Sequence, residues 1–137
     1  MTNWSPQVLK IFQQADTLVI MPYNDDGKTF EEISPVSPVV YDGSLYVRGW
    51  KGTATRWFIA AGHQPAGFIE LYGHRFPVTF EQVHKDESFD DNLSDAFWKK
   101  YEHSKTAAPH ALVGGPGVEA TLRILPRVDA QGKLALA

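Results

Sequence analysis

The stretch SLYVRGWKGTATRWF, residues 44–58, carries the clearest structural pattern in this sequence. Its first residues alternate, so that Leu45 and Val47 share one face of a strand and Arg48 lies on the other face. The preceding Asp42-Gly43 dipeptide is typical of a two-residue turn between antiparallel strands. The pattern therefore predicts the second strand of a β-hairpin, followed by a loop that contains two glycines.

Further short strands are expected on both sides of this hairpin. Proline cannot donate to a sheet, so the segment 34–42 predicts a strand that starts after Pro38 or lies at an edge. Pro77 sets a similar condition, an edge position or a bulge, on the strand that contains it. Besides the hairpin, the expected strands are residues 17–21, 68–72, 75–83 and 120–125.

The amino-terminal residues predict a helix. Ser5 suits an N-cap and Pro6 suits the first helical position, while Trp4 and Leu9 have the spacing of a hydrophobic staple. The apolar stripe of this helix ends at Ala15. We therefore expect Trp4 to dock the helix against the rest of the domain.

A second helix is expected to begin at Asp90 or Asp91 and to end near His103. Its apolar stripe is formed by Leu93, Ala96, Phe97, Lys100 and Tyr101. The apolar segment before Gly62 predicts a single helical turn. The segment 109–117, which is rich in proline and glycine, predicts a loop.

Together these elements predict a mainly β, α+β fold, namely a small antiparallel barrel of about six strands with two or three flanking helices. A chain of 137 residues with 43% hydrophobic residues is long enough for one core but not for two. We expect one domain over residues 1–128 and a flexible tail over residues 129–137.

Composition argues against several classes of protein. A net charge of -3 gives no general attraction to nucleic-acid phosphates or anionic lipids, so neither partner is expected. The absence of Cys excludes disulfides, thiol nucleophiles and Cys-ligated metals. The five histidines have no pairwise spacing typical of metal ligands, so no metal site is expected. Because the start lacks a basic leader and no long apolar run occurs, we expect a cytoplasmic protein.

The stretch from Gly43 to Ile69 has a composition that suits a flat, anionic ligand. It contains no Asp or Glu, and its cations alternate with aromatic residues. Basic side chains and hydroxyls can pair with a phosphate, and glycines let backbone N–H groups approach it. The candidate cofactor-binding residues are Arg48, Trp50, Lys51, Thr53, Arg56 and Trp57. The alternative is a solvated basic hairpin whose Trp residues complete the core.

Four motifs follow one another along the chain: SLYVRGWKGTATRWF, VTFEQV, DAFWKKY and ATLRILPR. Over about residues 15–127 the sequence thereby resembles a bacterial family of unknown function with a flavin-reductase-like, pyridoxamine phosphate oxidase-like split β-barrel. The chain departs from the family pattern at Gly49, where a small hydroxyl residue is usual, and at Ile59, where a basic residue is expected. Both departures are expected to weaken anion binding. The matching positions are Leu45, Tyr46, Val47, Arg48, Gly52, Trp57, Phe58, Ala96, Phe97, Lys100, Tyr101, Thr121, Leu122, Arg123, Pro126 and Arg127.

The resemblance implies a homodimer with a cofactor at its interface, in a superfamily that includes flavoproteins, deazaflavin-dependent reductases and haem-binding proteins. In one hypothesis, FMN or a deazaflavin supplies oxidoreductase chemistry, the candidate cations face its phosphate, Thr53 donates from the loop, and Trp50 or Trp57 packs on the ring. In the other, which the two departures favour, the protein is a non-enzymatic dimeric module that binds a small planar or anionic ligand or has lost the cofactor. Haem binding through His63 or His110 is a third alternative. The sequence identifies no catalytic residue.

Overall fold

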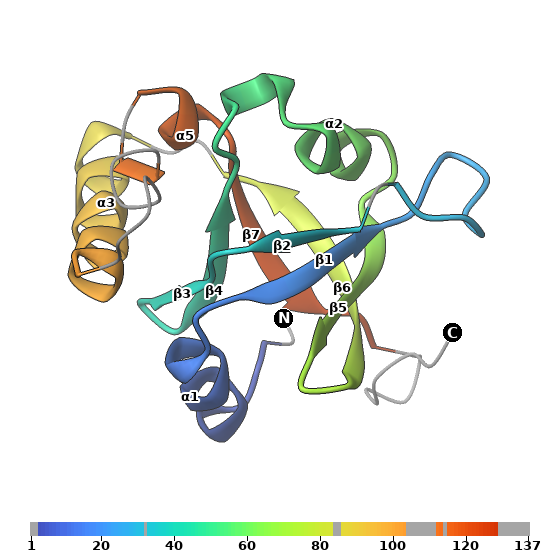
Figure 1. Cartoon of the computed structure of the whole chain (residues 1–137), viewed down its shortest axis with the longest axis horizontal. Coiled ribbons are helices and arrows are strands. Elements are labelled where there is room, and N and C mark those ends of the chain that lie inside the picture. The colour runs from blue at the N-terminus through green and yellow to red at the C-terminus, as the bar shows by residue number, and fades with distance from the viewer. Residues whose placement is uncertain (1–2, 32, 84–85, 104–111, 114, 129–137) are drawn as a thin grey trace.

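A computed structural model describes residues 3–31, 33–83, 86–103, 112–113 and 115–128 (Figure 1). Within these ranges, seven antiparallel strands form one curled sheet in the order β2-β1-β5-β6-β7-β4-β3. The strands are β1 (Leu18–Pro22), β2 (Ser34–Val36), β3 (Val39–Tyr41), β4 (Ser44–Arg48), β5 (Ala66–Leu71), β6 (His74–Gln82) and β7 (Thr121–Pro126). The predicted α+β split barrel is thereby confirmed. The tail expected from residue 129 lies outside the described residues.

The connection between β2 and β3 explains why the sheet curls. These strands lie at the two ends of the strand order, yet only Ser37 and Pro38 separate them in the chain. A flat sheet of this size would hold its edge strands roughly 29 Å apart, whereas three steps along the backbone reach at most about 11 Å. The sheet therefore rolls up until its edges meet at this connection, which we call the Ser37–Pro38 corner.

The hairpin and proline expectations fit this topology. Asp42 and Gly43 have φ of 48° and 77°, which are the left-handed values of the two-residue turn predicted between β3 and β4. β2 contains Pro35 and is an edge strand, and β3 starts directly after Pro38. Both outcomes expected for the segment 34–42 therefore occur in it, one after the other.

Pro77 corrects a prediction, because it lies neither at an edge nor in a bulge. It pairs in register with Phe68, in a strand that has β5 on one side and β7 on the other. Alternation of hydrogen-bond direction along β6 turns the Pro77 nitrogen toward β7, whose strand ends at Pro126. The Pro77 carbonyl still accepts from the Arg127 amide at 2.9 Å. The missing N–H thus falls where the neighbouring strand has ended.

Helices cover the outside of the sheet (Figure 1). They are α1 (Pro6–Gln14), the 3-10 turn η1 (Gly52–Ala54), α2 (Arg56–His63), α3 (Glu87–Tyr101) and α5 (Gly115–Glu119). The amino-terminal helix is confirmed, and its predicted cap Ser5 accepts from the Val8 amide at 3.3 Å. Within the described part of the chain, no helix is both long and apolar enough to span a membrane.

Two helix predictions were wrong in extent. α2 is a full eight-residue helix rather than one turn, because Trp57, Phe58 and Ala61 bury one of its faces. α3 begins at Glu87 rather than after Asp90 or Asp91, because Asp86 caps it by accepting from the Phe89 amide at 2.8 Å.

The segment predicted as a loop over 109–117 is in part helical. Residues 112–113 and α5 are helical, whereas residues 109–111 and 114 lie outside the described part. A Cβ at Gly52 would lie 3.0 Å from Pro116, so η1 packs closely against α5. This packing joins the carboxy-terminal region to the loop that follows β4.

Apolar side chains form two cores on the two faces of β4. Leu45 and Val47 enter the main core inside the barrel, as their alternation predicts. Tyr46 enters a second core, where it is clustered with Leu93 and Phe97 of α3. Because both faces are covered, every residue of β4 is buried.

Trp4 docks the amino-terminal helix on the main core. Its side chain is buried, and its ring meets Phe12 and Phe76 edge-on at centroid distances of 5.1 and 5.9 Å. The indole N–H also donates to the Ile124 carbonyl of β7 at 2.8 Å. The residue therefore contributes both apolar area and a buried hydrogen bond.

We expect Trp4→Ala to lower the free energy of unfolding by about 3 kcal/mol, because it removes a large buried ring and orphans a carbonyl. Trp4→Phe, which keeps most of the ring, should cost about 1 kcal/mol. Urea unfolding measures both, with Trp50→Ala as the exposed-Trp control. Equal midpoints for Trp4→Ala and the control would show that the helix is not docked in this way.

Candidate functional site

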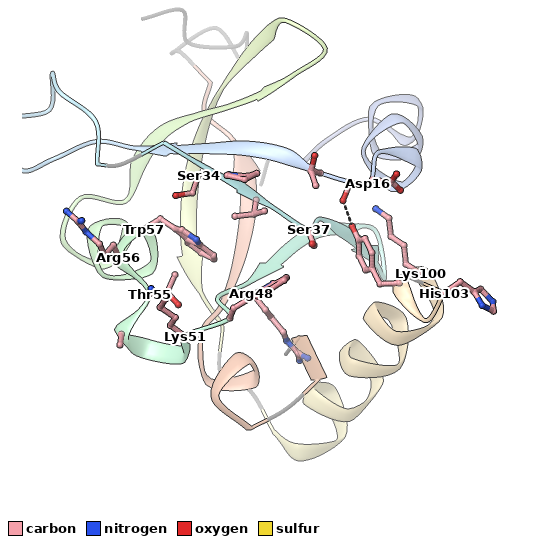
Figure 2. Close-up of a pocket in the computed structure, with 16 residues that line it drawn as sticks. Asp16, Ser34, Ser37, Arg48, Lys51, Thr55, Arg56, Trp57, Lys100 and His103 are labelled. Carbon is pink, nitrogen blue, oxygen red and sulfur yellow. Dashed lines mark hydrogen bonds between the residues drawn. The ribbon is translucent and has the colours of Figure 1, made fainter. Parts of the chain in front are cut away.

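A cavity of about 860 Å³ opens between the Ser37–Pro38 corner, the end of β4, the start of α2 and the end of α3 (Figure 2). Its size lies within the range of small-molecule and cofactor sites. Four cationic side chains and a single carboxylate line it, so its charge suits an anion. The lining residues are Asp16, Thr17, Ser34, Pro35, Val36, Ser37, Arg48, Trp50, Lys51, Ala54, Thr55, Arg56, Trp57, Lys100, Tyr101 and His103.

Most of the candidate residues lie at this cavity. Five of the six line it, namely Arg48, Trp50, Lys51, Arg56 and Trp57. Thr53 is exposed within η1 and is not part of the lining, whereas Thr55, two residues later, is. Trp57 is buried in the wall and Trp50 is 49% exposed, so the two indoles offer a fixed and an open surface respectively.

Arg48 is held by protein acceptors on every side. Its Nε donates to the Thr121 hydroxyl at 3.1 Å, and its Nη1 donates to the Ser94 hydroxyl at 2.7 Å and the Leu112 carbonyl at 2.9 Å. Nη2 donates to the Asp90 carbonyl at 3.2 Å. Four of the five guanidinium N–H groups are thus used to join β4, β7, α3 and residue 112.

Arg48, predicted as a cofactor-binding cation on the strand face opposite Leu45, is buried in the protein. Its side chain is 1% exposed and packs against the Phe97 ring, with 5.0 Å between the guanidinium carbon and the ring centroid. Burial lowers the pKa of Arg48 to about 10, against an opposing effect of Asp90. Alternation correctly placed Arg48 opposite Leu45, but α3 covers that face.

We expect Arg48→Ala to lower the free energy of unfolding by at least about 3 kcal/mol, because it orphans several buried acceptors at once. Arg56→Ala, a change at an exposed cation of the same cavity, should cost less than about 1 kcal/mol. Chemical denaturation monitored by circular dichroism compares them. An Arg48→Ala variant as stable as the wild type would contradict the structural role and show that Arg48 is available to bind a ligand.

The three candidate cations are not brought together on one side of the cavity. Figure 2 shows the Arg48 guanidinium directed toward α3, while the Arg56 side chain extends outward. Arg56 forms an ion pair with Glu31 at 3.0 Å. Lys51, at the turn between β4 and η1, is exposed. Of the three, Lys51 is therefore the cation best placed to move toward a ligand.

The two departures from the family pattern have different structural settings. A Cβ on Gly49 would lie 2.8 Å from the Thr55 Cβ and 3.0 Å from its Cγ2, so any larger residue would displace Thr55. Gly49 is thus required for packing in this chain. Ile59 lies on the exposed side of α2 beside a separate hollow of about 610 Å³ and does not line the main cavity. Its lack of charge leaves the lining of the main cavity unchanged.

Thr55 is the residue of this loop that sequence reasoning missed. Its side chain is 7% exposed, and its hydroxyl oxygen has no hydrogen-bond partner among the described residues. It stands at the N-cap of α2 but makes no side-chain cap hydrogen bond. The choice between Thr53 and Thr55 depended on how the turn folds, which residue type and spacing did not reveal.

The opposite end of the cavity is built on the Pro38 carbonyl. Lys100 Nζ donates to it at 2.6 Å and to the Phe12 carbonyl at 3.4 Å. The Tyr101 hydroxyl lies 2.8 Å from it and 2.9 Å from the Asp16 carbonyl, so its single O–H is shared between the two carbonyls. Lys100 and Tyr101 were predicted as part of an apolar helix stripe and as positions that match the resembled family, but not as residues of the site.

Burial shifts both titrations at this end. It lowers the pKa of Lys100 to about 8, although Asp16 acts in the opposite direction. It also raises the pKa of Tyr101, an effect to which Asp16 adds. The amine thus titrates well below its ordinary value of 10.5, and the phenol stays neutral.

We expect the wild type to gain stability relative to Lys100→Met as the pH rises from 8 to 10. In this interval the unfolded chain still holds the Lys100 proton that the folded chain has released, so unfolding becomes less favourable. Tyr101 acts in the opposite direction, but only as the pH nears the ordinary phenol pKa of 10. Urea titrations at several pH values measure the difference, and parallel curves for the two proteins would contradict it.

The histidines proposed for haem are not grouped at the cavity. His63 is exposed and lines the separate hollow beside Ile59, and His110 lies outside the described residues. His103 lines the main cavity, and Figure 2 shows its ring pointing outward. Among the described residues, no three His, Asp or Glu side chains are grouped in a way that could hold a metal ion.

Comparison with known proteins identifies the family. The model of DUF2255, described as an uncharacterized protein conserved in bacteria, matches residues 8–124, so the chain belongs to this family. A comparison with curated proteins found no match.

Solved structures with the same fold include three bacterial proteins. A conserved hypothetical protein, Rv2991 of Mycobacterium tuberculosis, has a TM-score of 0.59 and 12% identity, with 93% of this chain and 83% of that chain covered. A putative pyridoxamine 5'-phosphate oxidase of Listeria innocua has a TM-score of 0.60 and 14% identity, with 89% of this chain and 92% of that chain covered. The haem storage protein HutZ of Vibrio cholerae has a TM-score of 0.61 and 13% identity, with 93% of each chain covered. At these identities the likeness shows the fold alone.

Proposed function

We propose that this member of the DUF2255 family binds a flat, phosphate-bearing cofactor, FMN or a deazaflavin, in the 860 Å³ cavity and acts as an oxidoreductase. The observation that carries the proposal is the lining itself, which places two indoles beside an excess of cations. The fold is shared with a putative pyridoxamine 5'-phosphate oxidase, which is consistent with a phosphate-bearing ligand.

The residues of the cavity fit such a group. Trp57 is held in the wall and can pack on a planar ring, and Trp50 can cover the ring from the exposed side. Lys51 can pair with the phosphate, and Thr55, whose hydroxyl has no hydrogen-bond partner in the described part of the chain, is a further polar residue of the lining. A bound flavin or deazaflavin supplies hydride-transfer chemistry, so the chain's task is to bind, orient and shield it.

Arg48 and Arg56 have indirect parts in this proposal. Arg48 adds positive charge to the wall while its hydrogen bonds hold β4 against α3. Arg56 adds charge at the rim from its ion pair with Glu31. Thr53 is proposed only as a rim residue, because it does not line the cavity.

We also propose that the protein is a homodimer, as the resemblance implies. Trp50 and Ile59 are exposed apolar side chains at the mouths of the two hollows, and a second copy would cover such surfaces. The non-enzymatic alternative, a dimeric module for a small planar or anionic ligand, uses the same cavity without turnover.

Titration of the purified protein with FMN tests the proposal. We expect a visible-spectrum change on binding, and Lys51→Ala should weaken binding by at least about tenfold because a charge-assisted contact is lost. Lys99→Ala, an exposed change outside the cavity, is the control.

The same samples separate the alternatives. Bound flavin that a nicotinamide donor reduces supports the oxidoreductase, and bound flavin that stays oxidised supports the non-enzymatic module. Failure to bind FMN and a deazaflavin, with a Soret band on adding haem, would replace the flavin proposal with haem binding. A monomeric mass in light scattering would contradict the dimer.

A further inference from the structure

The amine of Lys100 is fixed where three segments of the chain meet at the cavity. Lys100 lies in the last turn of α3, lines the cavity and is half-buried. Its Nζ donates to the Pro38 carbonyl of the corner at 2.6 Å and to the Phe12 carbonyl of α1 at 3.4 Å. Figure 2 shows the side chain beside Tyr101, with its amine directed toward the segment of Asp16. Both acceptors are backbone groups, so the fold sets the position of the amine.

This amine has no carboxylate partner in the part of the chain that the structure describes. None of the ion pairs there includes Lys100, and Asp16 acts on it only from beyond ion-pair distance. An ammonium group that is partly removed from water without a counter-charge loses stability relative to the neutral amine. Burial accordingly lowers the pKa of Lys100 to about 8. At about pH 7.5 its neutral share is therefore about a hundredfold larger than that of an ordinary lysine.

A neutral amine at this place can act as a nucleophile. It has two N–H groups, and the carbonyls of Pro38 and Phe12 can accept both. No described residue makes a third hydrogen bond with Nζ, so the nitrogen lone pair is left unused. Because Lys100 lines the cavity, a small molecule inside the cavity can approach that lone pair. Desolvated lysines of this kind form Schiff bases with carbonyl compounds.

The other cations of the cavity do not combine these properties. A guanidinium group stays charged and is no nucleophile, and Arg48 and Arg56 are already held by protein acceptors. Lys51 is exposed, so water solvates its charge. These three side chains give the lining a positive charge that attracts an anion toward Lys100.

We propose that Lys100 is the reactive amine of the cavity and forms a Schiff base with a small aldehyde that carries an anionic group. The amine determines the aldehyde class, and the positive charge of the lining determines the anionic group. The reaction takes place at the α3 end of the cavity and requires no flavin. This inference therefore goes beyond the proposed function and does not depend on it.

The reaction balances without a further reactant. The neutral Nζ attacks the aldehyde carbon, the carbonyl oxygen takes a proton, and a carbinolamine forms. Loss of water then gives a protonated imine. In sum, one ammonium ion and one aldehyde yield one iminium ion and one water molecule. Of the three ammonium hydrogens, one stays on nitrogen and two leave with the aldehyde oxygen.

The Ser37–Pro38 corner can keep its attachment to α3 after this reaction. The remaining N–H of the imine can still donate to the Pro38 carbonyl, which is the nearer of the two acceptors. The Tyr101 hydroxyl, 2.8 Å from the same carbonyl, is not altered. Only the 3.4 Å contact with Phe12 is lost. Formation of the adduct is therefore compatible with the fold.

Reductive trapping with glyoxylate, an aldehyde that carries a carboxylate, tests the proposal on the intact wild type. Sodium cyanoborohydride converts the imine into a stable carboxymethyl amine, which peptide mass spectrometry assigns to one lysine. Lys99, the exposed neighbour of Lys100 outside the cavity, is the matched control within the same molecule. At about pH 7.5 we expect Lys100 to be labelled at least about tenfold faster than Lys99.

Glycolaldehyde, which has no charge, tests the ligand class in the same assay. We expect the ratio of Lys100 to Lys99 labelling to be at least about threefold lower than with glyoxylate, because the cations of the lining no longer contribute. Equal ratios would overturn the anionic class. Labelling of Lys100 no faster than that of Lys99 with either aldehyde would overturn the reactive amine and leave Lys100 a residue that only holds the corner. Neither result depends on flavin binding, which the FMN titration decides separately.

Discussion

The structure depends on one carbonyl group, that of Pro38. The Ser37–Pro38 corner joins the two ends of a seven-stranded sheet, so its position decides whether the barrel closes. Lys100 and Tyr101 both donate to this carbonyl, and they are the last two residues of α3. The corner that closes the barrel and the end of α3 are therefore joined through the same carbonyl. The cavity lies beside this corner, where β3 begins opposite Tyr46 and leaves Val47 and Arg48 of β4 without a partner in β3.

Arg48 holds the other end of α3. A guanidinium in a site that is 1% exposed is stable only because its N–H groups reach acceptors on three different elements. These acceptors become organised only when β4, β7 and α3 have assembled, so the cation makes the assembly specific. The same bonds remove Arg48 from direct ligand chemistry. Its charge remains in the wall, but four of its five N–H groups already donate to protein acceptors.

The cavity is consequently asymmetric in what it offers a ligand. At the α3 end, Lys100 and Tyr101 are occupied by backbone carbonyls and hold the corner. At the α2 end, the Thr55 hydroxyl has no hydrogen-bond partner among the described residues, and Lys51 is exposed. An anionic group would therefore find open donors at one end only. Trp57 forms part of the wall beside that end, which places a planar surface next to the anion-binding groups.

Local patterns determined the elements of this protein, and long-range contacts decided its site. The Asp42-Gly43 turn, the Ser5 cap and the alternation of β4 depend on neighbouring residues, so the sequence alone predicts them. It also located the cavity loop, because the basic and aromatic residues there are adjacent in the chain. The direction of Arg48 could not be predicted, since its acceptor Leu112 lies 64 residues away. The choice of Thr55 over Thr53 depended on the fold of a three-residue turn packed against Pro116. Burial and packing, which only the tertiary structure supplies, thus decided which of the predicted cations and hydroxyls are available to a ligand.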